Sequence, residues 1–151
     1  PRGGEEKAKF LTHKNIEKGK AEILREGEDV SIIAIGKMVA KAQNIAEILE
    51  NKGIDAEVIN ARFIKPVDYG MIENLAKNHK NIIVVEEAIK KGGFGESVEA
   101  YAQENNLNTK VSVMAIEDKF VEQGSVEELR DRLGINASAT NLCTLAVLSL
   151  P

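Results

Sequence analysis

The sequence is poor in several residues that mark specialised classes of protein. Its 151 residues include three prolines, no tryptophan and a single cysteine, and 4% of them are aromatic. Cys143 cannot form a disulfide within the chain and offers no cysteine-rich metal site, so we expect a reducing compartment, the cytoplasm. The shortage of cysteine therefore excludes a small secreted domain that depends on disulfides.

Long apolar runs and an excess of charge of one sign are also lacking. No run approaches the roughly 18 apolar residues of a membrane-spanning helix, and the charged amino end has no apolar signal segment. Twenty basic and 24 acidic residues give a net charge of -4, without the concentrated positive field that binding to a phosphate backbone requires. We expect one domain with its own hydrophobic core, and neither a membrane nor nucleic acid as a partner.

Strand-like and helix-like patterns alternate along most of the chain. Apolar residues at spacings of three and four predict amphipathic helices, and the apolar runs between them are typical of parallel strands covered on both faces. The alternation predicts a three-layer α/β/α domain, with a mostly parallel sheet of about five strands and one antiparallel edge strand. The expected strands are 21–26, 30–36, 56–60, 81–87 and 110–116.

Residues suited to helix ends mark several boundaries. Gly53 stands where the first helix needs a left-handed residue after its end, and Asp68 is expected to cap the start of the second. Ser125 and Glu128 have the spacing of a capping box. A last helix, more apolar than a surface helix should be, is expected at about 138–149.

The loop after the fourth expected strand is the most distinctive segment, because Gly92, Gly93 and Gly95 surround Phe94. Gly93 and Gly95 resemble the start of a dinucleotide-binding fingerprint, but Val98 stands where the third glycine belongs. A structural role is favoured: the glycines permit positive φ and a close backbone approach, and Phe94 can project into a neighbouring surface.

Other chemically capable residues are scattered. Glu86 and Glu87 are adjacent in a strand and point to opposite faces, so they cannot readily act as a pair, and we interpret each as a solvated acid or an interface ion pair. His13 and His79 have no acids nearby in the sequence and are expected at the surface. Cys143 is expected to be a small buried hydrophobe. No catalytic set emerges from spacing alone.

One further loop suggests an interface. Phe120 and Val121 follow the last expected strand, at the carboxyl edge of the sheet where α/β proteins gather their ligands. Loops of monomers rarely expose such an apolar pair without reason. We therefore expect another domain or subunit to cover this segment.

Four segments, taken together, resemble the carboxyl-terminal domain of transketolase-type thiamine-diphosphate enzymes, and most of all the 1-deoxy-D-xylulose-5-phosphate synthase family. The segments are 19–27 with the strand that follows, 61–68, 85–95 and 118–129. The resemblance implies that residues 18–151 are this domain. Residues 1–17 would then be a trailing segment or linker from a preceding pyrimidine-binding domain, as the fragment of a longer chain.

The resemblance also implies an activity for the full-length parent. Members of the family use thiamine diphosphate and Mg²⁺ to condense pyruvate with glyceraldehyde 3-phosphate, with loss of CO2, and they act as homodimers. The Gly-Asp-Gly motif that holds the metal and diphosphate is absent, so both cofactors are expected to bind outside this fragment, which alone would be inactive. Only Arg2 matches a position that the family associates with the phosphate of the aldehyde.

On the same resemblance, the domain is a scaffold that contacts the preceding domains of its own chain and a second subunit. The candidates for these contacts are Glu86, Glu87, Gly92, Gly93, Phe94 and Gly95, together with Phe120 and Val121. Two alternatives remain open. One is the carboxyl-terminal domain of the β-subunit of a 2-oxoacid dehydrogenase or another transketolase-type enzyme, and the other is a stand-alone nucleotide-binding module that uses residues 92–95.

Overall fold

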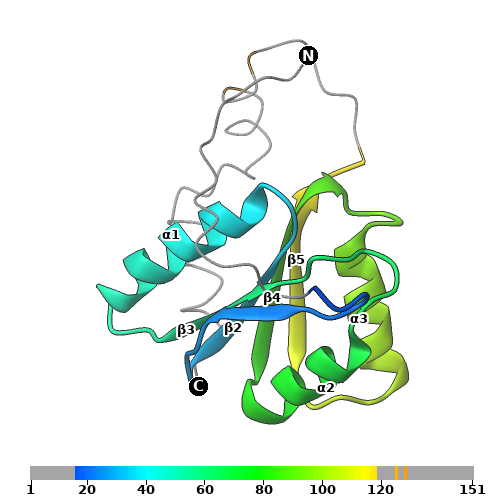
Figure 1. Ribbon diagram of the computed structural model, residues 1–151, viewed down its shortest axis with the longest axis horizontal. Helices are drawn as coiled ribbons and strands as arrows, with labels where there is room; N and C mark the ends of the chain where they lie inside the picture. The colour runs from blue at the N-terminus through cyan, green and yellow to red at the C-terminus, as the bar shows by residue number, and fades with distance from the viewer. Residues whose placement is uncertain (1–15, 119–124, 126–127, 129–151) are drawn as a thin grey trace.

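A computed structural model describes residues 16–118, 125 and 128 of the chain, and these residues form one five-stranded sheet with helices on both faces (Figure 1). The strand order is β1-β3-β2-β4-β5. Edge strand β1 pairs antiparallel with β3, and all other pairings are parallel. The predicted architecture is confirmed. The strands are β1 (Glu22–Arg25), β2 (Val30–Ala34), β3 (Ala56–Asn60), β4 (Asn81–Ile89) and β5 (Lys110–Ile116).

Three helices cover the sheet. Helix α1 (Met38–Glu50) packs on one face, and α2 (Tyr69–Asn78) and α3 (Phe94–Glu104) pack on the other (Figure 1). The alternation of side chains along β2 divides the interior accordingly: Ile32 belongs to the core under α1, and Ile33 to the core under α2 and α3. Each face of the sheet thus has its own apolar core.

The boundaries follow the predicted signals, with local differences. Gly53, three residues after the last residue of α1, has a φ of +78°, as expected of a left-handed residue past a helix end. The second strand ends at Ala34, two residues before the predicted end, and Gly36 has a φ of +61° in the turn that leads into α1. The expected helix at 138–149 lies outside the described residues. Among the described residues, no helix is both long and apolar enough to span a membrane.

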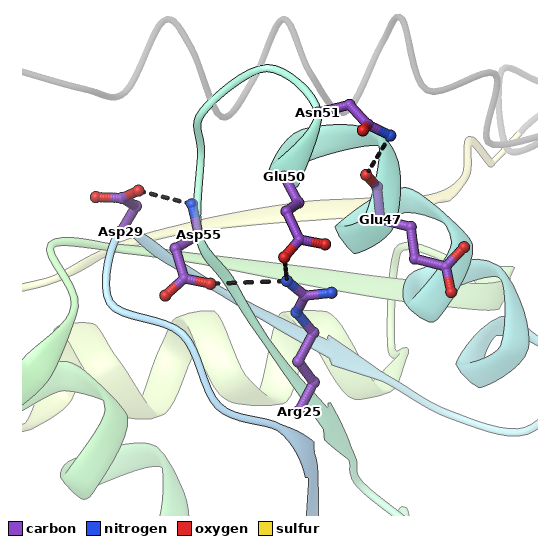
Figure 2. Close-up of polar contacts among 6 residues, drawn as sticks. All are labelled: Arg25, Asp29, Glu47, Glu50, Asn51 and Asp55. Carbon is purple, nitrogen blue, oxygen red and sulfur yellow. Dashed lines mark hydrogen bonds and ion pairs between the residues drawn. The ribbon is translucent and has the colours of Figure 1, made fainter.

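The amino edge of the sheet, where the parallel strands begin, is closed by polar contacts (Figure 2). Arg25 of β1 lies with its Nη2 atom 3.2 Å from a carboxylate oxygen of Glu50 and 3.8 Å from one of Asp55. Asp29 and Asp55 are joined twice, because the Asp29 carboxylate accepts from the Asp55 N–H at 2.7 Å and the Asp29 N–H donates to the Asp55 carbonyl at 2.9 Å. These contacts tie β1 and the start of β2 to the segment between α1 and β3.

Two buried side chains, those of Glu57 and His79, form a pair at the same edge of the sheet. His79 was expected at the surface, but it is 4% exposed, and its Nε2 atom lies 2.6 Å from Oε2 of Glu57, which is also buried. The backbone of His79 is extended where α2 ends, and Glu57 lies on the sheet face that α2 covers, so the two side chains meet beneath the helix end. His13 and Cys143 lie outside the described residues.

Candidate functional site

The carboxyl edge of the sheet holds the loops that sequence patterns single out. The loop 61–68 follows β3, and the loop 90–93 follows β4. Ligands of open α/β sheets bind at this edge, so its hydrogen-bonding groups decide whether a ligand can be held there. Two carboxylates, those of Glu86 and Asp68, organise the two loops.

Glu86 belongs to β4, and its side chain is buried beside the start of α3. Its carboxylate accepts hydrogen bonds from the backbone N–H groups of Phe94 at 3.0 Å and Gly95 at 2.8 Å, and the residue is 2% exposed. The first N–H groups of a helix lack partners within the helix, and its positive dipole end favours a carboxylate. Glu86 therefore caps α3 from a distance, which corrects the expectation of a solvated acid or an interface ion pair. Glu87 is exposed, as expected if the two side chains point to opposite faces.

The glycines of this loop allow the close approach that the sequence predicts. A Cβ atom on Gly93 would lie 2.7 Å from Oε1 of Glu86, and one on Gly95 would lie 2.3 Å from Cγ1 of Val113. Both distances are shorter than side-chain carbons adopt, so the helix start can reach the buried carboxylate and β5 only without these side chains. Gly92 has a φ of +75°, and its N–H donates to Glu96 at 2.5 Å.

Phe94 does not project into a neighbouring surface, as we expected. It is 4% exposed and belongs to the domain's own core under α2 and α3. A turn closed by the Gly93 N–H and the Lys90 carbonyl at 3.2 Å leads into α3, and the first residue of that helix packs in the core. An interface at this loop would have to use other side chains.

The second loop is organised by Asp68, which caps α2 as predicted. Its Oδ1 atom accepts from the Met71 N–H at 3.1 Å, and its Oδ2 atom accepts from the Ala21 N–H at 3.0 Å. The Lys20 ammonium lies 3.6 Å from Oδ1. Nothing in the sequence pattern indicated the contacts with residues 20 and 21, which join the approach to β1 with the start of α2. In the same loop, Arg62 has a φ of +56° and forms an ion pair with Glu22 of β1.

A small apolar cavity lies beneath these loops. Its volume is about 10 Å³, room for one water molecule at most. It is too small for a cofactor, but its lining shows that the loop 61–68 and the start of α3 meet over one end of the core. The lining residues are Ala21, Ile33, Ile59, Ala61, Phe63, Val67, Asp68, Met71, Ile72 and Phe94.

The carboxyl edge is poorly suited to a phosphate or a metal ion. A nucleotide or diphosphate would use the N–H groups at the start of α3, but Glu86 already accepts from Phe94 and Gly95, and its charge would repel an anion. In the part of the chain that the structure describes, no group of three or more histidine, cysteine or acidic side chains could hold a metal ion. We therefore assign no cofactor chemistry to these residues, and the nucleotide-binding alternative loses its support.

Several expected site residues lie outside the described residues, namely Arg2, Phe120 and Val121. Ser125 and Glu128 are described, and they make the reciprocal contacts of the predicted capping box: the Ser125 N–H donates to the Glu128 carboxylate at 3.1 Å, and the Glu128 N–H donates to Oγ of Ser125 at 3.3 Å. Hydrogen bonds from the Ser125 side chain and backbone lower the pKa of Glu128.

Comparison with known proteins agrees with this architecture. The profile of the family described as "Transketolase, C-terminal domain" matches residues 19–139. The chain belongs to this family. This transketolase-type domain resembles three curated proteins, each named 1-deoxy-D-xylulose-5-phosphate synthase. The identities are 43% over 120 residues for Lysinibacillus sphaericus, 42% over 138 for Clostridium perfringens (strain 13) and 38% over 149 for Carboxydothermus hydrogenoformans.

Coverage is unequal between the chain and these relatives. The alignments cover 79%, 91% and 99% of this transketolase-type domain but only 19%, 22% and 24% of the respective synthases. The chain thus corresponds to about a fifth to a quarter of each relative. The resemblance to the synthase family that the sequence motifs indicated is confirmed.

Solved structures show the same fold. A split gene transketolase, described as an inactive beta4 tetramer, superimposes with a TM-score of 0.82 at 28% identity, over 91% of this chain and 44% of that one. Transketolase from Campylobacter jejuni superimposes with a TM-score of 0.56 at 21% identity, over 85% of this chain and 19% of that one. The transketolase-type domain is therefore one part of larger enzymes.

Proposed function

We propose that this chain is the carboxyl-terminal domain of a 1-deoxy-D-xylulose-5-phosphate synthase. The observation that carries the proposal is an identity of 38–43% to three synthases over 79–99% of the chain. On this proposal, the parent enzyme condenses pyruvate with glyceraldehyde 3-phosphate and releases CO2. Thiamine diphosphate supplies the carbon nucleophile and electron sink for that reaction, with Mg²⁺ holding its diphosphate, on other domains of the parent.

The role proposed for this domain is that of a scaffold. Glu86 and Asp68 use their carboxylates to fix loops of the domain itself, and the apolar cavity beneath these loops has a volume of about 10 Å³. These features suit a surface that supports neighbouring domains of the parent and a second subunit better than a surface that binds a cofactor. Of the residues first considered for such contacts, Phe120 and Val121 remain candidates, and Arg2 remains the candidate for a substrate phosphate.

The test compares the isolated chain with the parent enzyme expressed from its complete reading frame. With thiamine diphosphate and Mg²⁺ present, we expect the parent to form 1-deoxy-D-xylulose 5-phosphate from pyruvate and glyceraldehyde 3-phosphate, and the isolated chain to form none. Calorimetry should detect binding of thiamine diphosphate to the parent and no binding to the isolated chain.

Three results would contradict the proposal. Tight binding of thiamine diphosphate by the isolated chain would place the cofactor site within this domain. A parent that transfers two-carbon units between sugar phosphates but does not use pyruvate would be a transketolase, the activity named for the structural neighbours. A parent without the cofactor-binding domains on the same chain would favour the β-subunit of a 2-oxoacid dehydrogenase.

A further inference from the structure

An open groove lies at the amino edge of the sheet, on the face that α2 covers. Its volume is about 880 Å³, which is within the usual range of sites for small molecules. The turn between β1 and β2 forms one side, and the second half of α2 forms the other. The buried side chains of Glu57 and His79 line its inner part. We call this space the amino-edge groove.

The lining of the groove is strongly acidic. Against one ammonium group, that of Lys77, it holds four carboxylates, those of Glu26, Glu28, Asp55 and Glu57. Arg25 lies 3.8 Å from Asp55 and offsets one of the four (Figure 2). A concave surface lined mainly by charges of one sign concentrates ions of the opposite sign. The groove therefore favours a cation.

A second, independent observation specifies the kind of cation. The side chain of His79 is 2% exposed, and its Nδ1 atom is buried without a hydrogen-bond partner among the residues that the structure describes. Its Nε2 atom lies 2.6 Å from Oε2 of Glu57, so in the neutral ring Nε2–H donates to the carboxylate and Nδ1 keeps a lone pair. A buried acceptor without a donor is costly. The partner that Nδ1 lacks is a donor group, and His79 lines the space from which a ligand would supply it.

The lining suits an organic amine better than a metal ion. Within the described part of the chain, no three histidine, cysteine or acidic side chains are placed to hold a metal. A primary ammonium group carries a positive charge and N–H donors together, so it satisfies both the carboxylates and the imidazole. Ile23 of β1, which is 38% exposed, also lines the groove and offers an apolar contact to methylene groups.

We propose that the amino-edge groove is a binding site for a small linear aliphatic diamine. One ammonium group donates to Nδ1 of His79 beside the Glu57 carboxylate, and the methylene chain contacts Ile23. The carboxylates of Glu26 and Glu28 attract the second ammonium group. The inference is independent of the proposed function, because every residue that it uses belongs to this chain and no step of the synthase reaction enters it.

Titration of the isolated chain with the diamine cadaverine tests the site. The matched probe is cadaverine with both nitrogens trimethylated, which keeps the two charges and the spacer but has no N–H to donate. Calorimetry measures the dissociation constants, and nitrogen NMR of the imidazole shows whether Nδ1 accepts a hydrogen bond. His13→Gln leaves His79 as the only imidazole in the chain. We expect cadaverine to bind roughly tenfold more tightly than the methylated probe, as a charged donor to a buried acceptor should, and to move the Nδ1 resonance upfield.

Two variants locate the ligand. Glu28→Gln removes an exposed carboxylate of the groove and should weaken cadaverine binding by roughly threefold. Glu47→Gln makes the same change at an exposed position of α1, which covers the other face of the sheet, and should leave binding nearly unchanged. Both positions are exposed, so both variants should fold normally.

Three results would overturn the site. Equal affinities for the two probes would mean that charge alone attracts them. An Nδ1 resonance that cadaverine does not move would mean that water or a protein group already serves the imidazole. Equal effects of Glu28→Gln and Glu47→Gln would place the diamine outside the groove.

Discussion

The two edges of the sheet are stabilised by different chemistry. At the amino edge, Arg25 pairs with acids that are 52% and 64% exposed at their side chains, and Glu57 and His79 form a buried pair. At the carboxyl edge, Glu86 and Asp68 accept hydrogen bonds from backbone N–H groups. Both edges carry ion pairs, including Lys20–Asp68 and Arg62–Glu22 at the carboxyl edge. The carboxyl edge differs because its two carboxylates also hold the starts of α2 and α3.

Glu86→Ala should have the largest effect, and it tests whether the carboxyl edge depends on its internal cap. The change leaves two buried N–H groups at the start of α3 without an acceptor, and we expect a loss of about 3 kcal/mol of stability. Urea unfolding of the isolated chain measures it. Glu104→Ala, at the exposed last residue of α3, is the control and should change stability by less than about 0.5 kcal/mol. Similar losses in the two variants would show that Glu86 does not cap the helix.

His79→Ala examines the buried pair of the amino edge. It leaves the Glu57 carboxylate beneath α2 without its partner, and the expected loss is about 2 kcal/mol. Lys80→Ala, at the exposed next residue, is the control and should be nearly neutral. If His79→Ala unfolds at the same urea concentration as the control, the pair does not stabilise the domain.

Arg25→Ala should have a smaller effect, because its acidic partners are largely exposed (Figure 2). We expect a loss of about 0.5 kcal/mol at low salt, and the loss should shrink as added salt screens the charges. Lys52→Ala, on the exposed turn after α1, is the control for the removal of a positive charge. A loss as large as that of His79→Ala, or one insensitive to salt, would mean that Arg25 acts through packing.

The stability that Tyr101 contributes should change only at alkaline pH. Its hydroxyl donates to Glu73 at 2.5 Å, and this hydrogen bond, with smaller contributions from burial and from the Glu73 charge, raises the pKa of Tyr101 above the ordinary 10.0. The folded state then holds the phenolic proton more tightly than the unfolded state does. The contribution to stability is complete below the ordinary pKa and is lost as the pH rises through the folded pKa.

A spectrophotometric titration checks this shift. The chain has two tyrosines, and Tyr69 stacks on Tyr101 with ring centroids 4.1 Å apart, so Tyr69→Phe leaves a single titrating phenol and keeps the stack. Adding Glu73→Gln should lower the pKa of Tyr101 toward 10.0. An unchanged titration would rule out Glu73 as the cause.

The fold could be predicted because its signals are local and periodic. Ile32 and Ile33 sit in a run that is apolar on both faces, which is typical of a central parallel strand. Asp68 precedes an apolar helical pattern and caps α2 as its position suggests. Features of this kind depend on residues that are neighbours in the sequence, so the sequence alone predicts them.

The roles of single residues depended on contacts between distant segments. The sequence alone favours a solvated acid or an interface ion pair at Glu86, because it does not show that α3 begins beside this residue. One signal was available: Ile82, Val84 and Glu86 share a face of β4, and a carboxylate on a covered face needs buried donors. The burial of Phe94 and the pairing of His79 with Glu57 likewise follow from tertiary packing, which no spacing rule encodes.

Asp68 also determines how force passes between this domain and the chain before it. A pull on residues 16–19 meets the Lys20 and Ala21 contacts with Asp68 before it reaches the short strand β1. Asp68 in turn holds the first turn of α2 through Met71. A displacement of the upstream chain would therefore act first on the contacts of Asp68 with Lys20, Ala21 and the start of α2, and only then on the pairing of β1 with β3.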